Sequence, residues 1–174
     1  MIKTKDLGIS FSGQKIFSDV SVNINKKEKI GFIGRNGSGK STFLKIIIGR
    51  LEQDDGEVIM PKGYKIGYLD QHIKFTHKSV VDEVCSVLSG DREYEIWKGE
   101  SILTGLGFTD EEMSKDPEGF SGGNQVKINL AKLLLEEPDM LLLDEPTNYL
   151  DIHSIKWLKN FLNDWRGELI LVTH

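Results

Sequence analysis

The chain has 174 residues, of which 39% are hydrophobic and 28% are charged, and its formal net charge at pH 7 is −5. This composition is ordinary for a globular protein and excludes collagen-like, low-complexity and wholly disordered chains. A chain of this length buries roughly two thirds of its unfolded surface on folding, so it requires neither disulfides nor a metal for stability.

Targeting and redox signals favour a cytoplasmic protein. The single cysteine, Cys85, cannot form an internal disulfide, and a reduced setting is the default for such a chain. The N-terminus has no apolar core of signal-peptide length, and no run reaches the roughly 18 apolar residues of a membrane helix. The charge is uneven, since residues 1–80 carry a net +6 and residues 81–174 a net −11. The basic half could face an anionic ligand or could be ordinary solvated surface.

The first part of the chain is predicted to form strands around one helix. β-branched and apolar residues predict strands over residues 2–11, 20–24, 29–33, 57–60 and 65–69. The third of these runs into a glycine-rich loop, and a helix over residues 40–48 follows, with Gly49 well placed to end it.

After Gln71 the pattern becomes mainly helical. Helices are expected over residues 80–88, 94–106, 122–136 and 152–165, the first capped by Ser79 and the third by Ser121. Apolar runs at residues 140–143 and 169–172 predict buried parallel strands. Strands that alternate with helices indicate an α/β layer fold, and the right-handed crossover rule fixes most of its topology.

The glycine-rich loop fits the pattern G-x-x-x-x-G-K-[ST], between a strand and a helix. Its residues are Gly34, Arg35, Asn36, Gly37, Ser38, Gly39, Lys40 and Ser41. Glycines let the main chain curl so that N–H groups point at phosphate oxygens, and the positive end of the following helix adds to that field. Lys40 can reach the β- and γ-phosphates, and the Ser41 hydroxyl can ligate Mg²⁺. We therefore predict a nucleoside triphosphate site; the alternative is a glycine-rich turn that binds nothing.

A pair of carboxylates at the end of an apolar strand supplies the second part of the expected site. Asp144 follows residues 140–143 directly, and Glu145 comes next. Asp144 is expected to hold the metal, through Ser41 or through water. Because adjacent residues on an extended chain point apart, Glu145 is expected to face the γ-phosphate side and to polarise the attacking water.

A third element is a serine followed by two glycines at a predicted helix start, Ser121, Gly122 and Gly123. A helix N-terminus of this kind makes a second anion site, although an ordinary capped helix would look the same. The phosphate loop already accounts for the binding of one γ-phosphate. This element therefore indicates either a second bound anion or a surface that contacts another molecule.

In this order, these elements resemble the ATP-binding cassette (ABC) family over nearly the whole chain. The matching motifs are GRNGSGKST (34–42), the glutamine of GYLDQ (67–71), FSGGN (120–124), LLLDEP (141–146), NYLD (148–151) and the histidine of LVTH (171–174). The run DEPTNYLD, residues 144–151, resembles the soluble ABC-F subfamily, whose members act on ribosomes. Transporter subunits more often carry serine and alanine in that stretch.

The resemblance implies a fold and a division of the chain. The fold is an α/β P-loop core of the ABC type, with a mixed sheet flanked by helices, an N-terminal antiparallel β subdomain and a helical subdomain insert. Residues 1–174 would form one ATP-binding domain, with the core at residues 1–70 and 124–174 and the helical subdomain at 71–123, ending in the signature motif. The family continues beyond the histidine, so we expect a fragment, the first cassette of a longer protein, with weak or no ATPase activity alone.

The resemblance also assigns site residues, with ATP and Mg²⁺ as cofactors. The catalytic residues would be Glu145, His174, Lys40 and Gln71, and the metal ligands Ser41, Gln71 and Asp144. Nucleotide contacts would come from Phe11, residues 34–42 including Thr42, and, from an opposite cassette, Ser121, Gly122 and Gly123. Phe11 would lie against adenine, with a core phenylalanine as the alternative. Asp151 would lie at the interface between the two cassettes.

The implied partner is a second cassette, in the same full-length chain or as a homodimer. We expect ATP to act between the two and hydrolysis to release them. The wider role is a soluble ribosome-associated ATPase or, as the alternative, the motor subunit of a membrane transporter, which would bind a transmembrane subunit. Phe120, Asn124, Lys127 and Tyr149 depart from common family residues. Only 50 positions separate Gln71 from Ser121, which leaves little room for the two-helix arm of many ABC-F proteins.

Overall fold

The computed structural model describes residues 2–69 and 74–173, so Gln71 and His174 lie outside the described residues. The chain divides into two compact units. A first unit contains residues 1–68, 139–145 and 166–174, and a helical unit contains residues 69–138 and 146–165.

All described strands belong to the first unit and form two sheets. The strands are β1 (Ile2–Phe11), β2 (Gln14–Ile24), β3 (Lys29–Ile33), β4 (Asp55–Ile59), β5 (Ile66–Tyr68), β6 (Met140–Asp144) and β7 (Glu168–Thr173). One sheet has the order β2-β1-β4 and is antiparallel, and the other has the order β3-β7-β6-β5 and is parallel. The α/β fold and the antiparallel β subdomain are confirmed.

One detail of the predicted fold differs: the core sheet, expected to be mixed, is parallel throughout within the described ranges, and the antiparallel strands form a sheet of their own. β1 and β2 are joined by a tight turn at Ser12 and Gly13, with φ of 50° and 82°, and so short a link allows only antiparallel pairing. Long connections that include helices join the strands of the other sheet, and these permit parallel pairing.

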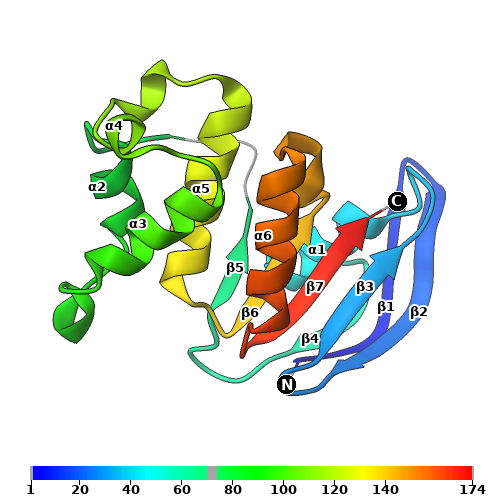
Figure 1. Ribbon diagram of the computed structural model, residues 1–174. Coiled ribbons are helices and arrows are strands. Elements are labelled where there is room, and N and C mark those ends of the chain that lie inside the picture. Colours follow the sequence, from blue (N-terminus) through cyan, green and yellow to red (C-terminus); the bar gives the residue numbers. More distant parts are fainter. Residues whose placement is uncertain (1, 70–73, 174) are drawn as a thin grey trace. The chain divides into compact units, whose positions relative to one another are not determined.

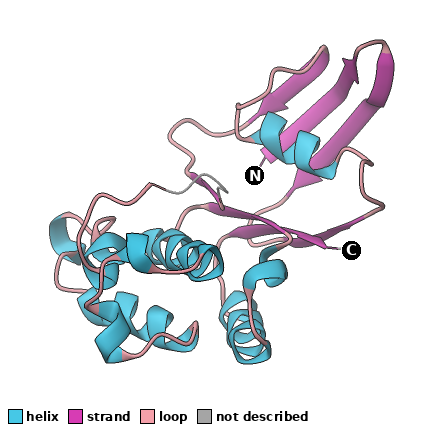
Figure 2. Cartoon of the chain, turned by 90° about the horizontal axis from the view of Figure 1, so that it is seen from above, coloured by secondary structure: helices cyan, strands magenta, loops and turns pink. Residues whose placement is uncertain are grey.

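The core of the first unit surrounds α1 (Lys40–Ile47). Phe43, Leu44, Ile46 and Ile47 of α1 belong to one buried cluster with side chains of both sheets. From the antiparallel sheet come Ile2, Leu7, Ile9 and Ile24, and from the parallel sheet come Met140, Leu142, Ile170 and Val172. Figure 2 shows this short helix beside the strands of the first unit. Gly49 ends α1 as predicted, with φ of 72° and its N–H bonded to the Ile46 carbonyl.

The helical unit contains the remaining described helices (Figure 1). They are α2 (Val80–Cys85), α3 (Ile96–Gly105), α4 (Asp110–Met113), α5 (Gly122–Glu136) and α6 (Ile152–Asn163), with 3₁₀ turns η1 (Gly90–Arg92), η2 (Pro117–Gly119) and η3 (Pro146–Tyr149). α5 packs against both α2 and α3. In the part of the chain that the structure describes, none of the helices is long and apolar enough to cross a bilayer.

The two compact units group the chain differently from the predicted core and helical subdomain, and that functional division remains a prediction. The prediction placed residues 124–174 in the core, whereas α5 and α6 group with the helical unit. The reason is packing: α5 lies against α2, α3 and η3, and α6 contacts α3. A Cβ built on Gly105 of α3 would lie 2.0 Å from the Trp157 ring of α6, so these two helices approach closely enough to require glycine.

Candidate nucleotide-binding site

The glycine loop joins β3 to α1 and has a backbone that requires glycine at two positions. Gly37 and Gly39 have φ of 78° and 89°, the left-handed region that residues with a Cβ avoid. A Cβ on Gly39 would also lie 2.7 Å from Ile16 Cγ2 of β2. The tight curl is therefore fixed both by backbone conformation and by packing against β2.

Lys40 is the first residue of α1 and is 6% exposed. Its Nζ donates hydrogen bonds to the carbonyls of Gly34, over 2.6 Å, and Arg35, over 3.0 Å. The ammonium group is thus held above the loop by neutral acceptors. An anionic phosphate oxygen would be a stronger acceptor and could replace them.

The structure brings the start of α1 and the end of β6 together. Ser41 Oγ donates a hydrogen bond to Asp144 Oδ2 over 2.6 Å, between residues 103 positions apart. Asp144 is the last residue of β6 and pairs with Val172 of β7, which fixes its backbone. A hydroxyl and a carboxylate are hard oxygen donors of the kind that Mg²⁺ prefers, so this pair fits the predicted metal.

Glu145 occupies a backbone conformation that the sequence did not predict. Its φ is 50°, and its N–H donates to the Val172 carbonyl over 3.0 Å. The expectation that Asp144 and Glu145 point apart assumed an extended chain, and that premise is wrong because Glu145 lies outside β6 in the left-handed region. A left-handed non-glycine residue costs about 1 kcal/mol or more and is often found at functional sites.

The signature residues begin α5 in the helical unit and face open space. Ser121 is the N-cap, and its Oγ accepts from the Asn124 N–H over 3.5 Å. A Cβ built on Gly122 or Gly123 would meet no atom within 4 Å. The first N–H groups of a helix have no partner within it, so this end can accept an anion from outside.

Gln125 was not predicted as a site residue, but it holds the loop before Ser121. Its Nε2 donates to the carbonyls of Phe120, over 3.1 Å, and Glu118, over 3.2 Å. Phe120 in turn packs edge-on against Phe108, with ring centroids 5.7 Å apart. The only sequence feature that indicated this role of Gln125 was a polar side chain four residues after the N-cap.

Asp151, predicted to lie at a cassette interface, caps α6 within the helical unit. Its Oδ1 accepts from the N–H groups of His153 and Ser154, and its Oδ2 accepts from Lys127 Nζ over 2.6 Å. The hydrogen bond from Lys127 and those from Ser154 hold the pKa of Asp151 well below its ordinary value. Lys127, noted in the sequence only as a departure from arginine, is therefore a structural link between α5 and α6.

The remaining predicted contacts are placed as follows. Phe11 ends β1 and is 44% exposed, so it is not a core phenylalanine. Arg35 and Asn36 are exposed and Thr42 is half-buried. Gln71 and His174 fall outside the described residues, and their predicted contacts remain predictions.

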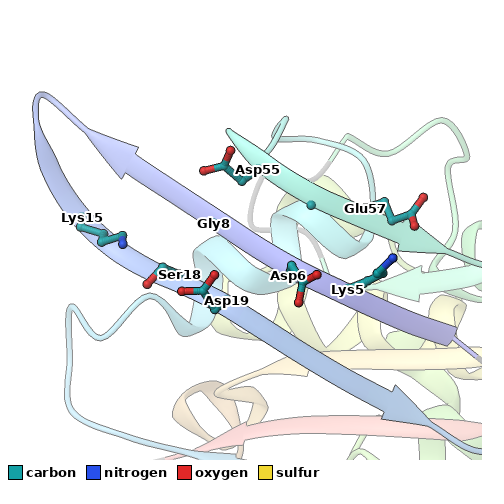
Figure 3. Close-up of a pocket in the computed structure, with 9 residues that line it drawn as sticks. Lys5, Asp6, Gly8, Lys15, Ser18, Asp19, Asp55 and Glu57 are labelled. Carbon is teal, nitrogen blue, oxygen red and sulfur yellow. The ribbon is translucent and has the colours of Figure 1, made fainter.

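A separate hollow lies on the antiparallel sheet of the first unit, as Figure 3 shows. It measures about 630 Å³ and includes none of the predicted nucleotide contacts. Its charged lining has both signs and consists of Lys5, Asp6, Lys15, Asp19, Asp55 and Glu57. A mixed lining of this kind gives no reason to place a triphosphate there, and the glycine loop remains the candidate site.

Comparison with known sequences gives consistent matches. The model of the family described as ABC transporter matches residues 17–148. The uncharacterized ABC transporter ATP-binding protein YfmM of Bacillus subtilis is 37% identical over 215 residues, covering all of this chain and 42% of YfmM. The ATP-binding protein Uup of Buchnera aphidicola is 36% identical over 181 residues, covering all of this chain and 30% of Uup. The chain spans less than half the length of these curated relatives.

Comparison with solved structures supports the same assignment. A structure described as the ATP-binding subunit of an ABC transporter has a TM-score of 0.85 and 25% identity, covering all of this chain and 79% of that one. The ATP-binding cassette MJ0796, in a dimeric post-hydrolysis state bound to ADP and phosphate, shares the fold, with a TM-score of 0.79, 22% identity and coverage of 100% and 88%. The glycine loop beside Asp144, the family match over most of the chain and these shared folds lead to one conclusion: the chain belongs to the ABC transporter family and is an ATP-binding cassette.

Proposed function

We propose that this chain binds and hydrolyses MgATP, with the nucleotide enclosed between two cassettes. The observation that carries the proposal is the hydrogen bond of 2.6 Å between Ser41 Oγ and Asp144 Oδ2. It joins the helix that begins at the phosphate loop to the carboxyl end of an apolar parallel strand. A metal ion bound to the γ-phosphate requires oxygen ligands from these two elements together.

In the proposed complex, the loop N–H groups and Lys40 bind the triphosphate. Lys40 Nζ exchanges the Gly34 and Arg35 carbonyls for the β- and γ-phosphate oxygens. When bound, Mg²⁺ would be held by Ser41 and Asp144, with Gln71, and would neutralise charge on the β- and γ-phosphates.

Hydrolysis in this proposal depends on positioning and on charge neutralisation. Glu145, directly after Asp144, orients the attacking water and accepts its proton. His174 holds Glu145 and the water in line, and Phe11, exposed at the end of β1, packs against the adenine.

The second half of the site comes from Ser121, Gly122 and Gly123 of another cassette. This role is supported by the open space in front of both glycines at the N-terminus of α5. The dimeric cassette MJ0796 with ADP and phosphate has the same fold. ATP would then hold two cassettes together, and its hydrolysis would release them.

For the wider role, we propose a cytoplasmic ABC-F ATPase that acts on the ribosome, as a translation factor or in antibiotic resistance. The run DEPTNYLD at residues 144–151 supports this choice. The second candidate is the motor subunit of a membrane transporter, which the names of YfmM and of the structurally similar ATP-binding subunit favour. Sedimentation of the full-length protein with ribosomes or with membranes separates the two roles.

Calorimetric titration with MgATP tests the nucleotide site. The wild-type chain should bind, and Lys40→Ala should lose most of its affinity, because it removes the charge that reaches the β- and γ-phosphates. Glu145→Gln should bind ATP normally but accumulate as the paired state on gel filtration. Equal MgATP affinity in wild type and Lys40→Ala would refute the proposed site.

A further inference from the structure

A short stretch of the helical unit exposes large apolar side chains. Tyr94 is 88% exposed, Trp97 62% and Ile96 48%. Tyr94 precedes α3, and Ile96 and Trp97 are the first two residues of that helix. The segment that leads into α3 lies at the edge of the helical unit (Figure 1). Single exposed apolar residues are ordinary, but three within four positions, two of them aromatic, are typical of a surface that contacts another protein.

The packing of α3 keeps these side chains outside. Gly99, Ile102 and Leu103 form the buried face of the helix. A Cβ on Gly99 would lie 2.7 Å from Cys85 Sγ, so this face lies directly against α2. Trp97 lies on the side of α3 opposite that face, so the helix cannot rotate to bury it without exposing its core residues. Ile96 lies nearer the buried face, in line with Leu103, but it is in the first turn of the helix and stays 48% exposed.

The basic residues of the same stretch are directed inward. Arg92 donates to the Leu135 carbonyl at the end of α5, over 2.8 Å, and to Glu95, over 3.0 Å. Lys98 donates to Glu95 over 2.8 Å, and its Nζ lies 5.8 Å from the centre of the Trp97 ring. Both cations are therefore occupied within the helical unit.

The acidic residues beside the apolar side chains are directed outward. Asp91, Glu93 and Glu100 are exposed, and within residues 2–69 and 74–173 none of them lies within 4.0 Å of a cationic group. The sequence of the helical unit holds 9 Lys and Arg against 16 Asp and Glu, a net charge of −7. The surface thus combines an apolar centre with an uncompensated negative rim.

We propose that this surface, formed by Asp91, Glu93, Tyr94, Ile96, Trp97 and Glu100, docks a basic amphipathic segment of a partner protein. Apolar side chains of the segment would cover Trp97 and Ile96, and its Lys or Arg side chains would pair with the three carboxylates. Charge selects this occupant: the phosphates of a nucleic acid would be repelled, and so would the helical unit of a second copy. The proposal goes beyond ATP hydrolysis and does not depend on it.

The probe is a fluorescent synthetic peptide of leucine and lysine at helical spacing, titrated against the chain at two salt concentrations with anisotropy as the readout. Matched probes are the same composition scrambled to remove the apolar face, the peptide with glutamate for lysine, and a single-stranded RNA. The chain variants are Trp97→Ala and the triple variant Asp91→Asn, Glu93→Gln and Glu100→Gln. Their controls are Ile59→Ala, exposed on β4, and the triple variant Asp110→Asn, Glu118→Gln and Asp164→Asn, also exposed in the helical unit.

The amphipathic basic peptide should bind, with an affinity that falls with salt, and the other probes should not. Trp97→Ala and the first triple variant should each weaken binding tenfold or more, as expected for a central aromatic and for its charge partners, while the controls keep wild-type affinity. Because Trp97 is mostly exposed, circular dichroism should show an unchanged fold. Absence of peptide binding, equal weakening in the controls, preferred binding of the RNA, or a self-association that Trp97→Ala abolishes would each overturn the proposal.

Discussion

Lys127 of α5 donates a hydrogen bond to Asp151, the N-cap of α6, over 2.6 Å. The same Nζ bonds to the Leu106 carbonyl, at the end of α3, over 3.2 Å. One ammonium group therefore ties three helices of the helical unit together. It also links the helix that begins with the signature residues to the segment after Glu145.

Lys127→Met should lower the free energy of unfolding by about 1 to 3 kcal/mol, because it removes the charged donor from the Asp151 carboxylate and the Leu106 carbonyl, which keep only their hydrogen bonds from His153 and Ser154. Lys127→Arg, the residue common in the family at this position, should recover most of that loss. Urea unfolding measures both variants. A double-mutant cycle with Asp151→Asn should give a coupling energy of about 0.5 to 2 kcal/mol, and additive effects would show that the contact contributes nothing.

A buried carboxylate in the helical unit should make stability depend on pH. Glu83 is 1% exposed and accepts from Lys132 Nζ over 2.5 Å, from the N–H groups of Thr76 and His77, and from the side chains of both residues. Burial raises its pKa, but these hydrogen bonds together outweigh burial and lower the pKa to about 2.

Because the folded-state pKa of Glu83 lies below its ordinary value of 4.5, its stabilisation is full above about pH 5 and is lost as the pH falls toward 2. The contribution is about 2 to 3 kcal/mol. Urea unfolding at several pH values should show this loss in the wild type, and Glu83→Gln should remove that part of it. A Glu83→Gln variant with the wild-type pH dependence would contradict the assignment to Glu83.

Two glycines of the phosphate loop should respond differently to alanine. Gly37 and Gly39 both have positive φ, but a Cβ on Gly37 meets no atom within 4 Å, whereas one on Gly39 meets Ile16 at 2.7 Å. Gly37→Ala should cost about 1 kcal/mol of backbone strain, and Gly39→Ala about 2 to 4 kcal/mol, since it adds a clash with β2. Thermal unfolding of the two variants side by side tests this order, and equal costs would contradict the described packing.

The sequence predicts the local elements of this cassette better than its tertiary contacts. Gly49, the Ser121 cap and the apolar run before Asp144 are local signals, and each lies where expected. The predicted second strand began only at residue 20, whereas β2 begins at Gln14, because the left-handed Asp19 interrupts the alternation of buried and exposed residues. α4 was missed although Thr109 and Glu112 form a capping box that can be read from the sequence.

The contacts that define the site could not be predicted from the spacing of apolar residues along the chain. The 2.6 Å separation of Ser41 and Asp144 depends on how α1 and β6 pack, and only the family resemblance pointed to it. The left-handed Glu145 could not be inferred, because an apolar strand gives no signal for the residue that follows it. Lys127 looked like a simple substitution until its three acceptors, Asp151, Leu106 and Ser154, could be seen around it.

The central claim, a triphosphate held by one cassette and enclosed by another, is tested most directly by mixing two inactive variants. Lys40→Ala removes the phosphate-loop cation, and Gly122→Asp adds a carboxylate where the signature glycine faces open space. Gly119→Asp is the matched control, since its Cβ also meets no atom within 4 Å.

The measurement is ATP turnover of each variant alone and of an equimolar mixture, at high protein concentration and as a fraction of the wild-type chain's own turnover, which we expect to be weak. Each variant alone should show no ATP turnover, and the control should retain wild-type turnover. The mixture should recover about a quarter of wild-type turnover, because random pairing makes half of the dimers mixed and each mixed dimer has one intact site of two. Wild-type turnover by Gly122→Asp alone, or a mixture with no more ATP turnover than its components, would contradict the shared site.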